Sequence, residues 1–143
     1  MGSKEYARGR RVVARLAHGG DLLQEIAAVA DAHGTAAAEV RATGAPSEAR
    51  LAFYDQHARV YGDFAVDGPV ELVSLLGNVS RRDGATMVHV HATLAGHDCA
   101  CVGGHVAPGC RVSARDLMLE ALEGDPLERE YDEVRGLPLW RGL

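Results

Sequence analysis

The sequence predicts an α+β domain whose sheet is mainly antiparallel. One segment near the N-terminus has the apolar spacing of an amphipathic helix, and short strand-like segments separated by turn residues make up most of the remaining chain. A single early helix followed by strands at hairpin spacing is typical of this fold class. The length of 143 residues is that of one domain, so we expect residues 1–143 to fold as a single unit.

The first two predicted elements are a strand over residues 10–18 and a helix within residues 19–34. Asp21 is the expected N-cap, since its carboxylate can accept the free N–H groups of the first helical turn, and Gln24 completes a capping-box pattern. Gly34 suits a left-handed C-terminal cap. The buried stripe of the helix consists of apolar residues at helical spacing, namely Leu22, Ile26, Val29 and Ala30.

The remaining predicted strands cover residues 36–44, 48–55, 70–80, 86–95 and 99–113. Turn residues at 44–46, 67–69, 83–84 and 108–109 separate them. The segment 115–122 fits a last strand or a short helix equally well. Residues 125–143 have no clear period, and we expect them to pack as an extended arm through Leu137, Leu139 and Trp140.

Composition and charge restrict the class of protein. Hydrophobic residues make up 47% of the chain but aromatic ones only 5%, which predicts a core of aliphatic residues and alanine and favours subunit association to complete it. The net charge of −5 argues against broad wrapping around nucleic acid, although a local basic patch is compatible with it. Three cysteines argue against a disulfide framework. No apolar run could span a bilayer and no secretory signal is present, which predicts a cytoplasmic protein without a membrane partner.

The stretch HVHATLAGHDCACVGGH, residues 89–105, concentrates four histidines and two cysteines. Even positions in both strands of this hairpin are apolar or small, so the odd positions share the other face. A three-residue loop at 96–98 pairs His89 with His105 and brings His89, His91 and His105 together on that face. A loop of two or four residues, or a bulge at 103–104, would turn His105 to the opposite face.

Three imidazoles on neighbouring strands are typical of zinc sites that leave one coordination position open. Hydrogen bonding at a surface or a subunit contact is an equally good interpretation of these three histidines. Cys99 and Cys101 share the face and could act as soft ligands, but small buried thiols are the better interpretation, also for Cys110. Tyr54 and Tyr61 are expected to shape a turn and edge contacts.

Several segments in the same order resemble the plant and prokaryote conserved (PPC) domain: VELVSLLGNVSRRDG, HVH, GGH and YDEVRGLPLW, together with ARLAHGGDLLQEIAAVADAHG upstream. The resemblance runs from about residue 12 to 140. It implies a strongly bent antiparallel sheet flanked by helices, a homotrimer, and a stand-alone prokaryotic protein. It also implies DNA-binding or regulatory roles and a metal held by His89, His91 and His105.

Two carboxylates are candidates to support these histidines. Glu71 lies within an apolar strand, where it is either paired or near the metal face. The resemblance implies that Asp116 occupies a position where glutamate is common. The motif Arg8-Gly9-Arg10 is followed by Arg11 and not by the proline of an AT-hook, so the hook is incomplete.

Three functions are compatible with the sequence as hypotheses. The first is a non-catalytic trimeric module that binds DNA or a regulatory partner and holds a divalent metal, preferably zinc. The second is a small metal-dependent enzyme in which Glu71 or Asp116 is the base. The third is a trimer that binds a small ligand on the same histidine face. We favour the first, because no acid–base pair stands next to the histidines in the sequence.

Overall fold

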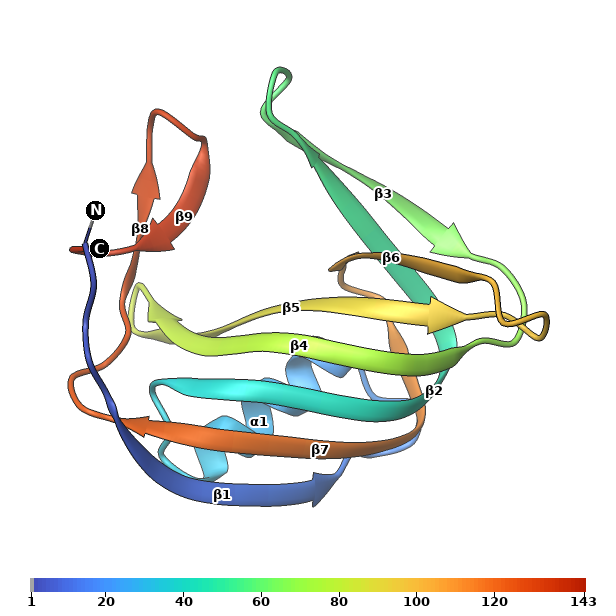
Figure 1. The fold of residues 1–143 in the computed structure, drawn as a ribbon, viewed down its shortest axis with the longest axis horizontal. Coiled ribbons are helices and arrows are strands. Elements are labelled where there is room, and N and C mark those ends of the chain that lie inside the picture. Colours follow the sequence, from blue (N-terminus) through green and yellow to red (C-terminus); the bar gives the residue numbers. More distant parts are fainter. Residues whose placement is uncertain (1) are drawn as a thin grey trace.

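The computed structural model describes residues 2–143 as a strongly curved antiparallel sheet with one helix (Figure 1). The strands of the main sheet are β1 (Ala7–Arg15), β2 (Ala38–Asp55), β3 (Val60–Val66), β4 (Glu71–Arg82), β5 (Ala85–Ala95), β6 (Cys101–Val106) and β7 (Arg111–Glu123). A separate hairpin consists of β8 (Arg129–Asp132) and β9 (Leu137–Trp140), and the helix is α1 (Leu22–Ala32). The strand order is β1-β7-β2-β4-β5-β6, with β3 paired to β2.

The long strand β2 organises the sheet because its two halves have different neighbours. Its first half pairs with β4 and β7, whereas its second half pairs with β3 and β6. The register shifts around Gly44, whose φ is +137° and whose position has no room for a side chain, since a Cβ would lie 2.0 Å from the carbonyl oxygen of Ala114. The chain therefore bends at Gly44, where the sequence predicts a turn over 44–46. The predicted strands 36–44 and 48–55 form the single strand β2.

The helix α1 forms within the segment that the sequence predicts, with Asp21 as its N-cap. Asp21 Oδ1 accepts hydrogen bonds from the backbone N–H groups of Leu23 and Gln24 at 3.1 and 3.3 Å, and Gly34 ends the helix with a φ of +62°. Leu22, Ile26 and Ala30 are buried against the sheet. With 11 residues, α1 is too short to cross a membrane, and no other helix occurs within residues 2–143.

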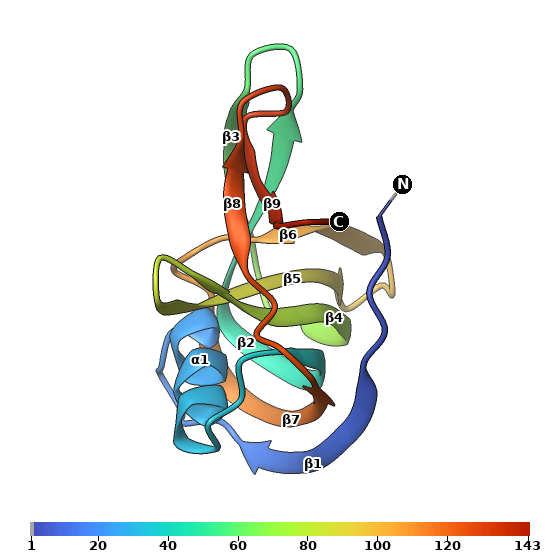
Figure 2. The same cartoon turned by 90° about the vertical axis from the view of Figure 1, so that its left-hand side faces the viewer.

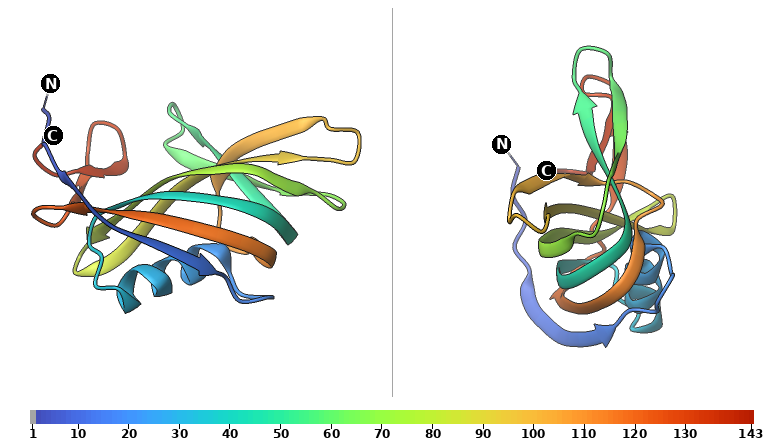
Figure 3. Two further views of the ribbon diagram at one scale, coloured as in Figure 1. Left: turned by 60° about the horizontal axis from the view of Figure 1, so that its bottom comes forward. Right: turned by 90° about the vertical axis from the view of Figure 1, so that its right-hand side faces the viewer.

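The predicted fold class needs correction. Helices do not flank the sheet on both sides: α1 covers one face, and the described chain is otherwise strands and turns (Figures 2 and 3). The ambiguous segment 115–122 is part of β7, the predicted arm is the β8–β9 hairpin, and β3 was not predicted. The molecule is therefore mostly antiparallel β structure, because only residues 22–32 combine helical spacing with both caps.

The core lies between α1 and the sheet and is aliphatic, as the composition predicts. Its fully buried side chains include Leu51, Leu75, Leu94 and Leu117, and the cluster contains no aromatic residue of the described chain. Cys110 is buried within this core. Cys99 and Cys101 are exposed, contrary to the prediction of buried thiols.

Candidate metal centre

Three histidines meet on the face of the sheet that α1 does not cover. His89 and His91 are two residues apart on β5, and β6 places His105 directly opposite His91. The ring centroids are 5.1 to 5.4 Å apart, and one nitrogen from each ring lies within 4.8 Å of the others. The Nε2 atoms of His89 and His91 are 3.3 Å apart. The structure thus brings together the three side chains that the parity of the strands selects.

The register of this hairpin differs from the predicted one by two residues. The loop has five residues, 96–100, because Cys99 adopts a φ of +63° and the N–H of Gly96 donates to the carbonyl of Ala100 at 3.0 Å. Ala95 therefore pairs with Cys101, and His105 pairs with His91 instead of His89. A shift of two residues leaves every side chain on its face, so the cluster forms in spite of the wrong pairing.

Strand β4 supports His89 from the neighbouring position in the sheet. Asn78 pairs with His89, and Gly77 pairs with Val90. A Cβ at Gly77 would lie 2.0 Å from the carbonyl oxygen of His89, so the two backbones approach closely only because this residue is glycine. This part of β4 therefore lies directly beside His89 in the sheet.

Arg129, which no sequence motif identified, connects the β8–β9 hairpin to the histidines. Its guanidinium donates to Ser80 Oγ at 2.8 Å, to Asn78 Oδ1 at 3.0 Å, to the carbonyl of Pro138 at 2.7 Å and to Nδ1 of His89 at 3.4 Å. It also lies 5.4 Å from the ring centroid of Trp140. Arg129 is only 8% exposed, so a buried cation stands beside the cluster.

Two tyrosines of the β2–β3 hairpin complete the surroundings. The ring of Tyr61 lies 5.0 Å from the ring of His105 and 5.0 Å from that of Tyr54. The hydroxyl of Tyr54 donates to the carbonyl of Arg135 at 2.8 Å, and Arg59 donates to that of Glu133 at 3.2 Å. The β2–β3 and β8–β9 hairpins therefore touch each other beside the histidines, and the tyrosines do more than shape a turn.

The surroundings of His89 and His105 favour the uncharged form of both rings. Burial lowers the pKa of His89 from 6.5 to about 4, with the positive charge of Arg129 and the neighbouring imidazoles adding to the effect. Burial and His91 also lower the pKa of His105. Neutral imidazole is the form that binds metal ions. The donor set therefore fits a borderline divalent ion, and the buried Nδ1 of His105 has no partner within the described structure.

The two carboxylates proposed as supporting residues lie elsewhere. Glu71 is exposed and pairs with Ala95, four residues along β5 from His91, which is about 13 Å of strand. Asp116 is on β7 opposite Arg15, and β7 is three strand spacings, or about 14 Å, from β5. Neither is among the side chains that the structure gathers around the histidines.

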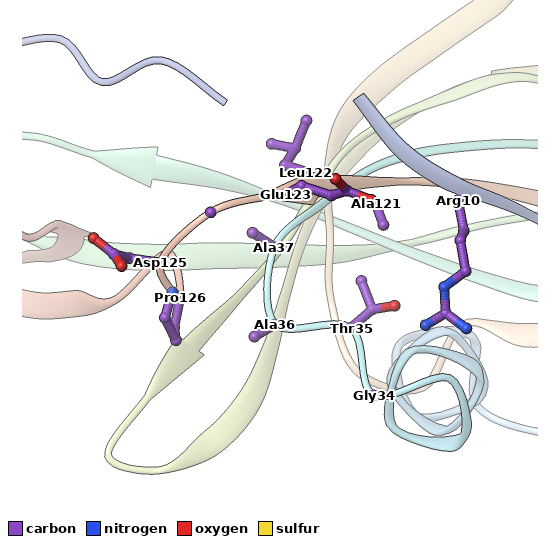
Figure 4. Close-up of a pocket in the computed structure, with 11 residues that line it drawn as sticks. Arg10, Gly34, Thr35, Ala36, Ala37, Ala121, Leu122, Glu123, Asp125 and Pro126 are labelled. Carbon is purple, nitrogen blue, oxygen red and sulfur yellow. The ribbon is translucent and has the colours of Figure 1, made fainter. Parts of the chain in front are cut away.

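A separate hollow of about 320 Å³ lies where the end of α1 meets β7 (Figure 4). The guanidinium of Arg10 beside it donates to the carbonyl of His33 at 2.6 Å, which caps the end of the helix. Arg8 belongs to β1 and pairs with Leu122 of β7. The Arg-Gly-Arg motif is thus part of a strand, and this hollow contains none of the three histidines.

Solved structures of other proteins have the same architecture as this chain. The chain is similar to a metal-containing protein from Archaeoglobus fulgidus, with 35% identity and a TM-score of 0.91 over 98% of this chain and 99% of that one. It is also similar to a plant- and prokaryote-conserved (PPC) protein from Pyrococcus horikoshii, with 29% identity and a TM-score of 0.92 over 100% and 99% of the two chains.

A candidate DNA-binding protein from Bacteroides thetaiotaomicron has the same fold, with 19% identity and a TM-score of 0.84 over 96% of this chain and 97% of that one. A search of curated proteins gave no match. The model of the Plants and Prokaryotes Conserved (PCC) domain matches residues 3–123, which include all three histidines. The chain therefore belongs to the Plants and Prokaryotes Conserved domain family.

Proposed function

We propose that this protein binds one divalent metal ion, preferentially zinc, through His89, His91 and His105. The observation that carries the proposal is the convergence of three ring nitrogens within 4.8 Å on one face of the sheet. The lowered pKa values of His89 and His105 support it, since these two ligands need not lose a proton at neutral pH. The similarity to a metal-containing protein at 35% identity points in the same direction.

Metal analysis of the purified protein tests this proposal. The chain is stripped with a chelator, dialysed against Zn²⁺ or Co²⁺ and measured by mass spectrometry of the elements. We expect about one ion per chain in the native protein and less than a tenth of that in the variants His91→Ala and His105→Ala. His97→Ala is the matched control, because His97 is exposed in the loop of the same hairpin. Equal metal content in all four proteins would overturn the proposal.

We further propose that the protein is a homotrimer that associates through the histidine face of the sheet. Val13, Met118 and Leu76 are 74%, 54% and 59% exposed, and they lie in one cross-strand row. Arg41 lies between Met118 and Leu76 in this row. Exposed apolar side chains of this size on one face of a sheet favour burial against another subunit. Native mass spectrometry should find three times the chain mass of 15.2 kDa, and Met118→Asp should shift the population to single chains. A native protein that is a monomer at micromolar concentration would contradict this.

Binding to DNA is a second candidate, and β1 is the feature that favours it. This edge strand carries Arg8, Arg10, Arg11 and Arg15, and the side chains of Arg8 and Arg11 are 81% and 68% exposed. Glu120 pairs with both and compensates part of their charge. Fluorescence anisotropy with duplex DNA at 50 and 200 mM salt tests this role. Micromolar binding that weakens with salt, and weakens further in Arg8→Gln/Arg11→Gln, supports it, whereas no binding at 50 mM salt refutes it.

A further inference from the structure

All the hydrogen-bond acceptors of the buried Arg129 guanidinium are neutral. They are a serine hydroxyl, an asparagine amide, an imidazole and a backbone carbonyl. Within residues 2–143, no carboxylate forms an ion pair with this guanidinium. A guanidinium has five N–H groups, so these four bonds leave one without an acceptor. The positive charge of Arg129 is therefore uncompensated by any carboxylate of the described residues.

Metal binding would increase this imbalance. Since a guanidinium only donates, Nδ1 of His89 accepts from Arg129, and the neutral ring carries its proton on Nε2, which faces His91. Ligation through Nε2 requires the proton on Nδ1, where it no longer accepts from Arg129. Arg129 would then have a second N–H group without an acceptor, next to a dication with three neutral ligands.

A groove beside Arg129 offers room for a small organic molecule. Its volume is about 420 Å³, within the range of small-ligand sites. Its lining combines the apolar side chains of Leu122, Leu127 and Trp140 with the polar ones of Glu39, Arg41 and Asn78. Asn78 and Trp140 also contact Arg129. An anionic group held at Arg129 would therefore have its apolar remainder beside leucine and tryptophan side chains.

We propose that the ligand of this site is a small organic carboxylate. Its carboxylate is recognised by Arg129 next to His89 of the three-histidine centre, and its apolar body lies in the groove along Leu122, Leu127 and Trp140. Planar pairing with two oxygens is the geometry that guanidinium provides. This inference rests on the proposed metal centre, and it adds a class of ligand that the histidines alone do not specify.

Intrinsic fluorescence gives a local readout, because Trp140 is the single tryptophan of the chain and lines the groove. The Zn²⁺-loaded protein is titrated with isovalerate and with isovaleramide, which has the same body without the charge. We expect isovalerate to bind at least tenfold more tightly than isovaleramide. Acetate lacks the apolar body of isovalerate and so tests how much the groove contributes to affinity. Inorganic phosphate tests whether any oxyanion binds as tightly as isovalerate. Equal binding of isovalerate and isovaleramide would overturn the proposal on the native protein alone.

Variants separate Arg129 from general charge effects. Arg129→Gln should weaken isovalerate at least tenfold, whereas Arg135→Gln, on the loop of the same hairpin, should leave it unchanged. Both proteins are first assayed for zinc. Native protein without zinc would refute the metal centre, whereas full zinc content with equal isovalerate affinity in Arg129→Gln would refute only the role of Arg129. Phosphate binding as tight as that of isovalerate would likewise refute the role of the groove.

Discussion

His89 makes the stability of the metal-free protein depend on pH in a defined window. Its pKa is about 4 in the folded protein and 6.5 when the ring is free in water. As the pH falls, the unfolded chain therefore binds a proton at His89 before the folded protein does. The contribution of neutral His89 to stability is complete above pH 6.5 and is lost between pH 6.5 and about 4.

The size of this effect can be worked out from the two pKa values. The difference between 6.5 and about 4 corresponds to a ceiling of about 3 kcal/mol, since one pH unit is worth about 1.4 kcal/mol. His89 is only partly buried, so solvent screens its charge and we expect about 1.5 kcal/mol. The pKa of Asp132 lies below 3.8, and its contribution is lost only at lower pH than this window.

The variant His89→Gln isolates this contribution, because glutamine keeps an acceptor for Arg129 but does not titrate. Both proteins are unfolded with guanidinium chloride in the presence of a chelator, at pH 7.0 and at pH 4.5 and at equal chain concentration. The free energy of unfolding of the native protein should fall by about 1.5 kcal/mol more than that of the variant. His97→Gln is the control and should behave as the native protein does. The same pH dependence in His89→Gln and in the native protein would show that His89 is not held neutral by burial.

Three further predictions concern the scaffold. Gly77→Ala places a Cβ 2.0 Å from the carbonyl of His89, so we expect zinc affinity measured by calorimetry to fall more than tenfold; unchanged affinity would contradict the close approach. Asp21→Ala removes the N-cap and should cost about 1 kcal/mol of unfolding free energy in chemical denaturation, with zinc content unchanged. A thiol reagent should modify two cysteines of the native chain quickly and Cys110 only after unfolding, as Cys110 is 2% exposed; fast modification of all three would refute its burial.

The histidine cluster could be predicted from sequence because strand parity tolerates an error of two residues. Both the predicted three-residue loop and the observed five-residue loop are odd, so His105 faces the same side in either register. The positive φ of Cys99 that lengthens the loop could not be predicted, since a non-glycine residue seldom adopts it. The helix was predicted from its caps and its stripe, which are local signals.

The partners of the cluster could not be predicted because they depend on tertiary contacts. Arg129 contacts His89 across 40 positions of the sequence. The β8–β9 hairpin, which carries Arg129, lacks the hydrophobic alternation that would predict a strand. Tyr61 belongs to β3, whose residues are mostly exposed and therefore show no burial pattern. A charged residue in a short polar strand has no sequence signal that distinguishes it from a surface residue.

Among residues 2–143, two arginines are buried without a carboxylate partner, and their positions assign them different roles. Arg115 is 2% exposed, its Nε and Nη1 atoms have no partner, and its nearest polar side-chain contact is the sulfur of Cys110 at 4.0 Å. No ligand can reach it, so any compensation must come from within the core. Arg129 has four neutral acceptors and lies beside an open groove and the three clustered histidines. Because a buried cation is costly without a counter-charge, an anion from solution stabilises Arg129 where it cannot stabilise Arg115.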